Sequence, residues 1–362
     1  MNAIPETAAD RIAKQRSLIL LAGISYAIRM IYSAAVYLQN TGNAGWIEAI
    51  GGFLACLPAL FLLQAITRNE IEHDQKAGWL KKAVCLILIP FFSFDASSWV
   101  FALAESPSYT SFAEESLYVL YIPALVTVTI ISSRGANACG GLARGLRAPI
   151  IGMLLLALVW QIDQMHPIWL TPVLGTGIAP IARGSALCGG YAALYPAGIW
   201  LFLQEDAGTA EAQIRRKICR CLPEATLAAV LFLLCYGMLT PNMPDAPHIR
   251  SFAMERLLTG GGRNTSVHFP SLLSWYAMLL ITAVYSMFCT STALKLLFPA
   301  RSLLFCACIS AVLCLLWTPV RMFWKHGEDL LVFSNVVVIT LVLLLLYLQT
   351  KRRKRRSGYA NR

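Results

Sequence analysis

Charge is scarce in this sequence: only 14% of its 362 residues are Asp, Glu, Lys or Arg, against about 25% in an ordinary soluble protein. Apolar residues make up 57% of the chain, and the mean hydropathy is +0.61. This composition excludes an intrinsically disordered chain and most soluble enzymes. The sequence also lacks a nucleophile–base arrangement, a phosphate-binding loop and a cysteine pair with metal-type spacing. We therefore expect no enzyme activity, no cofactor and no metal site.

Long apolar runs are what the chain has in abundance. Many are at least 18 residues long, enough to cross a hydrocarbon layer of about 30 Å as a helix, and the backbone must pair with itself there. We predict an all-α, polytopic membrane protein with ten spans, placed at Ser17–Leu38, Trp46–Ile66, Lys82–Ala104, Ser116–Ile131, Pro149–Gln164, Leu187–Gln204, Leu222–Leu239, Ser271–Leu297, Ser302–Val320 and Leu330–Thr350. Residues 1–16 form a leader, 17–350 a single transmembrane domain and 351–362 a basic tail.

The basic residues predict the orientation. With the N-terminus in the cytoplasm, 23 of the 30 Lys and Arg residues fall in cytoplasmic segments and 6 in outer loops, which leaves Arg29 inside a span. Cytoplasmic loops carry such an excess. Lys351–Arg356 is a wholly basic block directly after the last apolar run, where an anchor to anionic headgroups belongs. We predict that both termini are cytoplasmic and that the net charge of +11 serves the lipid bilayer rather than a nucleic acid.

One loop and the helix after it resemble a known family. The stretch WLTPVLGTGIAPIARG (Trp169–Gly184), followed by YPAGIWLFL (Tyr195–Leu203), resembles the B subunits of bacterial spore germinant receptors. Asn43–Ile47, which opens the second predicted span, and Leu117–Leu120, in the fourth, follow that family's order of features. The resemblance covers nearly the whole chain, and the loop is its specific part.

The resemblance implies both a fold and a function. The fold would be related to the amino acid–polyamine–organocation (LeuT-like) transporters, with two inverted five-helix repeats and discontinuous first and sixth helices. The function would be the membrane-embedded, ligand-sensing subunit of a nutrient germinant receptor in the spore inner membrane. Its partners would be a small nutrient germinant, such as an amino acid, and the receptor's A and C subunits. A small-solute permease of the same superfamily is the alternative function, and a packing scaffold for the A subunit is a third.

The sixth predicted span has residues that a helix break needs. Pro196 removes a backbone donor, Gly198 permits unwinding, and Gly189-Gly190 loosens the preceding turn. A broken helix exposes N–H groups that attract carboxylates, so the stretch from Tyr195 to Gly198 is a candidate binding site. A proline kink without a ligand is the alternative interpretation.

The first predicted span departs from the family's pattern, because Ala27-Ile28-Arg29 stands where relatives have helix breakers. An arginine near the bilayer centre costs at least about 2.5 kcal/mol, so it needs a partner or a wet cavity. Asp95, inside the third span, is placed to supply the partner. Two interpretations stay open: a structural Arg29–Asp95 pair, or an Arg29 that binds an anionic group of the nutrient. Ile199 lies where relatives often carry Glu, so the chain shows no obvious ion-coupling residue.

Other polar residues of the spans are weaker candidates. Ser25 and Tyr26 flank the midplane of the first span, Ser98 lies within a turn of Asp95, and Tyr276 lies in the eighth span. Each also suits an ordinary interhelical hydrogen bond. The complete candidate ligand-binding set is Ser25, Tyr26, Arg29, Asp95, Ser98, Tyr195, Pro196, Gly198 and Tyr276.

Overall fold

The computed structural model describes residues 8–41, 44–69, 78–108, 117–160, 162, 165–171, 177–205, 212–239, 265–323 and 325–360. Within these ranges the chain forms α-helices, one short 3-10 helix and no strand, which confirms the all-α prediction. The elements are α1 (Ala8–Thr41), α2 (Gly45–Asn69), α3 (Gly78–Ser108), α4 (Leu117–Ser133), α5 (Ala136–Trp160), η4 (Pro167–Leu170), α6 (Ile178–Glu205), α7 (Ala212–Leu239), α9 (Thr265–Leu297), α10 (Leu303–Phe323) and α11 (Lys325–Ala360).

Six of the helices are long and apolar enough to cross a membrane: α2, α3, α5, α6, α7 and α9. Shorter apolar stretches occur in α4, α10 and α11, at Val119–Ser133, Leu303–Pro319 and Ser334–Gln349. α1, which carries Arg29, is not among either group. The structure therefore confirms a multi-pass helical membrane protein, and the number of ten crossings stays a prediction.

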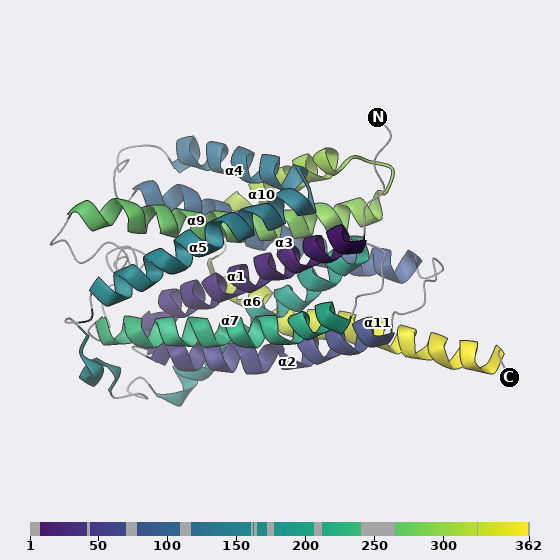
Figure 1. Ribbon diagram of the computed structural model, residues 1–362, viewed down its shortest axis with the longest axis horizontal. Helices are drawn as coiled ribbons and strands as arrows, with labels where there is room; N and C mark the ends of the chain where they lie inside the picture. The colour runs from purple at the N-terminus through teal and green to yellow at the C-terminus, as the bar shows by residue number, and fades with distance from the viewer. Residues whose placement is uncertain are drawn as a thin grey trace.

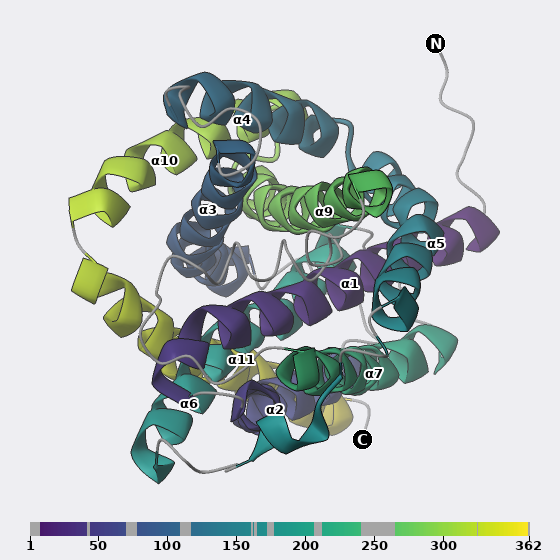
Figure 2. The same ribbon diagram turned by 90° about the vertical axis from the view of Figure 1, so that its left-hand side faces the viewer.

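α1 lies at the centre of the bundle. It packs against α5, α6, α7 and α9, and Figure 2 shows it between α3 and α9 on one side and α2 and α7 on the other. α4 and α10 flank α3 and α9 at the periphery. α1 begins and α11 ends at the same end of the bundle (Figure 1), as an even number of crossings requires. Which end faces the cytoplasm stays a prediction.

The helix pairings come in matched sets. The contact between α1 and α5 corresponds to the contact between α6 and α11. In the same way, the contact between α2 and α6 corresponds to the contact between α7 and α1. The contact between α3 and α4 corresponds to the contact between α9 and α10. The contact between α4 and α9 corresponds to the contact between α10 and α3. Exchanging the first five helices for the last five converts one member of each of these sets into the other, whereas the α2–α11 contact has no such counterpart among the described residues. Such matching is what a five-plus-five repeat predicts, and the inverted repeat itself stays a prediction.

The predicted breaks in the first and sixth helices are wrong. α1 is continuous, and α6 is continuous from Ile178 to Glu205 with Pro196 inside it. In α1 the reason is local, because Ala27-Ile28-Arg29 contains no helix breaker. In α6 the reason is packing, because α2, α9 and α11 approach the helix closely and leave it no room to unwind. The Tyr285 hydroxyl of α9 donates to the Tyr195 carbonyl of α6 at 3.5 Å.

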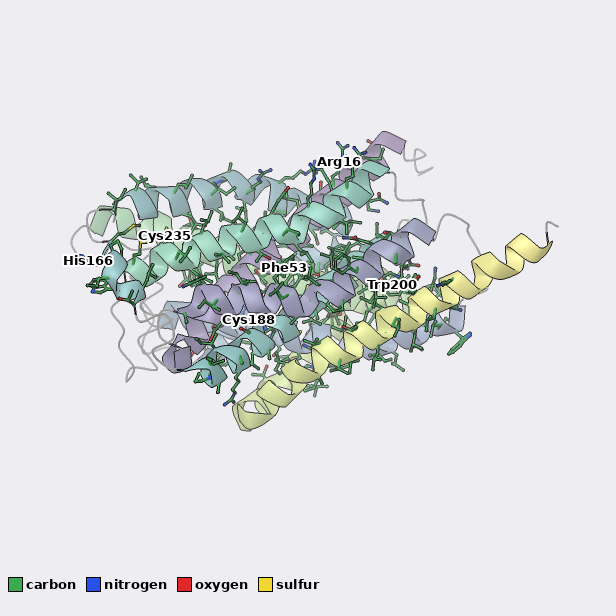
Figure 3. All side chains as sticks on the ribbon, turned by 90° about the horizontal axis from the view of Figure 1, so that it is seen from below. Arg16, Phe53, His166, Cys188, Trp200 and Cys235 are labelled. Carbon is green, nitrogen blue, oxygen red and sulfur yellow. The ribbon has the colours of Figure 1, made fainter. Side chains whose placement is uncertain are left out.

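The glycines of α6 serve close packing rather than unwinding. A Cβ on Gly198 would overlap the Tyr285 side chain of α9, and one on Gly190 would overlap the backbone carbonyl of Val332 on α11. Small residues let helix backbones approach one another in membranes. Figure 3 shows α11 crossing the face formed by α2 and α6, and the contacts agree.

Glycines also permit close packing on the side of α6 that faces α2. A Cβ on Gly52 would lie 2.6 Å from Cys188 Cβ, and one on Gly189 would lie 2.6 Å from Ala55 Cβ. Of all the helix pairs, α2 and α6 share one of the most extensive contacts. α6 is thus enclosed by close neighbours, which explains why its proline and glycines do not interrupt the helix.

Several predicted boundaries shift. α5 begins at Ala136, well before the predicted span, after Gly135 has turned the chain with a φ of +83°. α6 begins at Ile178, so the last part of the Trp169–Gly184 stretch is helical. α1 begins within the predicted leader, and α11 continues as a helix through Lys351–Arg356. These ends extend beyond the apolar cores, because helix hydrogen bonding does not stop where hydropathy falls.

Candidate functional site

A charged cluster lies where α1, α3 and α9 meet. Arg29 Nη2 lies 2.7 Å from Asp95 Oδ1, and the two residues are only 3% and 2% exposed. The Ser286 hydroxyl of α9 donates to the second Asp95 oxygen at 2.5 Å. The contact that the structural interpretation of Arg29 requires is therefore present.

Two aromatic rings enclose the same guanidinium. Arg29 Cζ lies 3.4 Å from the ring centre of Tyr191 on α6 and 4.8 Å from that of Trp99 on α3. A desolvated cation–π contact contributes about 2 kcal/mol. We call Arg29, Asp95, Trp99, Tyr191 and Ser286 the arginine cluster. Its positive and negative charges are paired, which makes a buried arginine tolerable inside the bundle.

Three tyrosines adjoin the arginine cluster, and we call Tyr26, Tyr195 and Tyr285 the tyrosine cluster. The Tyr195 ring stacks on Tyr285 at 4.9 Å between centres and meets Tyr26 edge-on at 5.2 Å. The Tyr195 hydroxyl donates to the Ser25 carbonyl at 3.0 Å. The hydroxyls of Tyr26 and Thr226 share a hydrogen bond of 3.1 Å. These contacts join α6 to α1 and α9, and α1 to α7.

The structure brings most of the predicted site residues together. Ser25, Tyr26, Arg29, Asp95 and Tyr195 all belong to these clusters or bond to them. Pro196 and Gly198 lie beside them in α6, where Gly198 admits the Tyr285 side chain.

The two remaining predicted residues are Ser98 and Tyr276. Ser98 donates to the Phe94 carbonyl at 3.1 Å within its own helix. Tyr276 precedes Ser286 by ten residues on α9, which places it about 15 Å along the helix axis.

Two buried residues were missed by the sequence analysis. Tyr191 precedes Tyr195 by one helical turn, so helical spacing could have revealed it as part of the same face. Glu48 on α2 is fully buried, and a Cβ on Gly184 of α6 would overlap its carboxylate. Glu48 could have been found from the sequence because it is an acidic residue inside the second predicted span.

The loop that carries the family resemblance is described in part. Residues 172–176 lie outside the described residues, as does Asn43 of the second motif. The loop's first part is tied to α7, because the His166 N–H donates to the Met238 carbonyl at 2.8 Å. The Trp169 ring of η4 lies 4.5 Å from the His166 ring. Figure 3 shows His166 at the end of the bundle opposite the C-terminal end of α11.

We expect Tyr195→Phe to lower the free energy of unfolding by about 0.5–1.5 kcal/mol, because it removes one buried hydrogen bond and keeps the ring. Unfolding in mixed detergent micelles measures this. Phe61→Leu, at a position of α2 that is 60% exposed, is the control and should stay within about 0.5 kcal/mol. Equal effects of the two substitutions would remove the role assigned to the Tyr195–Ser25 bond.

Comparison with known proteins addresses the fold. No protein-family model matches the chain, and no curated protein matches it. Among solved structures, MhsT in complex with L-phenylalanine is 12% identical, covering 91% of this chain and 88% of that chain with a TM-score of 0.62. An Eremococcus coleocola manganese transporter, in complex with an aromatic bis-isothiourea substituted compound, is 11% identical, with 95% and 79% covered and a TM-score of 0.58.

A third structure agrees with these two. Mhp1, a nucleobase-cation-symport-1 family transporter in a closed conformation with bromovinylhydantoin bound, is 14% identical, with 91% and 76% covered and a TM-score of 0.56. All three are membrane transporters rather than enzymes. At these identities the likeness concerns the fold. This chain is therefore a helical membrane protein with the fold of LeuT-like transporters.

Proposed function

We propose that this protein is the membrane-embedded, ligand-sensing subunit of a nutrient germinant receptor in the spore inner membrane, with both termini in the cytoplasm. A small nutrient, such as an amino acid, binds where α1, α3, α6 and α9 meet. The observation that carries the proposal is the gathering of buried charged and hydroxyl groups at this crossing. Solved structures of the same fold include one with L-phenylalanine bound and one with bromovinylhydantoin bound. The Trp169–Gly184 motif supports the receptor role.

Sensing requires two conformations of the bundle. Arg29, Asp95 and Tyr195 are almost fully buried, so a solute reaches them only when helices around the crossing move apart. A nutrient shifts the equilibrium only by its difference in affinity for the two states. The A and C subunits relay that shift toward spore germination.

Two observations favour sensing over ion-coupled transport. α1 and α6 are unbroken, so the helix-end groups that hold coupling ions in broken helices are absent from their described central turns. The Asp95 carboxylate is already paired with Arg29. A small-solute permease is the second candidate, and it is favoured by the three neighbours, all of which are transporters.

A deletion strain separates the two candidates. We expect spores without this chain to lose germination toward one nutrient while uptake of that nutrient by growing cells is unchanged. Proteoliposomes containing the chain alone should not accumulate the labelled nutrient. Uptake by proteoliposomes, with normal germination of the deletion strain, would establish the permease instead.

Complementation tests the proposed binding site. In the deletion strain, we expect Tyr26→Leu to raise the nutrient concentration for half-maximal germination at least about tenfold, because losing a hydrogen bond and a ring contact to the bound nutrient costs about 1.4 kcal/mol or more. Immunoblotting should show a normal protein level. Phe61→Leu, at a position of α2 that is 60% exposed, is the control and should leave the response unchanged. An unchanged response for both would favour the scaffold function.

A further inference from the structure

The side chains around Arg29 form a binding site for a cation, and the cation that fills it is the Arg29 side chain of the same chain. α3 supplies the Asp95 carboxylate and the Trp99 ring, α6 supplies the Tyr191 ring, and α9 supplies the Ser286 hydroxyl. A carboxylate together with aromatic faces binds guanidinium and ammonium ions. α1 contributes the cation itself, at the tip of Arg29.

The walls of this site are held by contacts that do not involve Arg29. The Ser286 oxygen also lies 3.2 Å from the Thr282 carbonyl of its own helix, so its one proton is shared between that carbonyl and Asp95 and the side chain is held facing Asp95. The Trp99 ring lies 5.1 Å from the Tyr32 ring. Trp99 and Ser286 are fully buried, and Tyr191 is 4% exposed. The site should therefore keep its shape when the arginine side chain is shortened.

We propose that Arg29 is a tethered cation, and that this site takes a free guanidinium ion from solution when the Arg29 side chain is shortened. The consequence is that the Arg29 cation joins α1 to α3 and α6 directly and to α9 through the Asp95–Ser286 hydrogen bond. The Asp95 carboxylate is then neutralised in every ionic medium, without a dissolved metal ion or a proton. This inference goes beyond the proposed function and needs no knowledge of the nutrient.

Chemical rescue tests the proposal on the purified full chain. We expect Arg29→Ala to lower the melting temperature in detergent by more than about 5 °C. About 20 mM methylguanidinium chloride should restore at least half of that loss, whereas N-methyl-D-glucamine chloride, a bulky cation at the same ionic strength, should restore none. The wild-type protein should respond equally to both salts.

Second-site variants show where the rescuing ion binds. Rescue should vanish in Arg29→Ala/Asp95→Ala and persist in Arg29→Ala/Glu48→Gln, since Glu48 is another fully buried acid. Equal stabilisation of Arg29→Ala by the two salts would overturn the proposal. Rescue that survives the loss of Asp95 would overturn it as well.

A variant that unfolds on purification still gives an answer. In that case the yield of monodisperse Arg29→Ala protein should rise at least threefold when membranes are solubilised with methylguanidinium. Equally low yields in both salts, while the uncharged Arg29→Met/Asp95→Leu pair purifies normally, would overturn the proposal. Because no nutrient enters these assays, a failed germination experiment leaves their outcome unaffected.

Discussion

Asp95→Asn is expected to lower the free energy of unfolding by about 3–5 kcal/mol, the usual result of removing one partner from a buried ion pair. The Arg29 guanidinium would stay buried between Tyr191 and Trp99 with no carboxylate at 2.7 Å. An arginine inside a membrane bundle is costly without such a partner. Unfolding in mixed detergent micelles measures the loss.

Two further variants make the Asp95 experiment decisive. Glu224→Gln removes an exposed acid of α7 and should change stability by less than about 0.5 kcal/mol. Arg29→Met/Asp95→Leu removes both charges and should be more stable than Asp95→Asn, because an apolar pair of similar size often replaces a buried ion pair without loss. A loss below about 1 kcal/mol for Asp95→Asn would mean that this pair does not hold α1 in place.

Gly190→Ala is the second substitution with a large expected effect, a loss of about 1–3 kcal/mol from overpacking. The added Cβ would overlap the backbone carbonyl of Val332, and a backbone group cannot rotate away as a side chain can. α6 and α11 would have to separate. A loss of stability would be informative, because Gly→Ala inside a helix otherwise raises the free energy of unfolding by up to about 1 kcal/mol.

Gly141→Ala on α5 is the matched control. A Cβ there meets nothing within 4 Å, so we expect a gain of about 0.5–1 kcal/mol from helix propensity. Both variants are compared by unfolding under identical detergent conditions. A gain in both would contradict the close α6–α11 packing.

The sequence was most informative where a signal is local or chemically costly. Apolar run length predicted the helical membrane fold, because the bilayer core imposes one length scale on every span. The cost of burying Arg29 pointed to Asp95, and the pair lies at 2.7 Å. The argument from run length needs one window of residues, and the argument from Arg29 needs one residue. Both otherwise depend only on the properties of lipid.

The errors concern what neighbouring helices do. Pro196, Gly190 and Gly198 have the composition of a break, yet they lie in a continuous helix that α2, α9 and α11 approach closely. A glycine that permits unwinding and one that permits close packing look the same in a single sequence. Tyr191 was missed for a related reason, since its role depends on Arg29 reaching it from another helix.

A structure of the protein with its nutrient is the most direct test of the proposed binding site. The nutrient is the one to which the deletion strain no longer responds, and cryo-electron microscopy of the purified receptor would locate it. We predict density for the nutrient where α1, α3, α6 and α9 meet, within contact of Tyr26 or Tyr195. Nutrient bound at another place, with both clusters as closed as in the unliganded protein, would contradict this prediction.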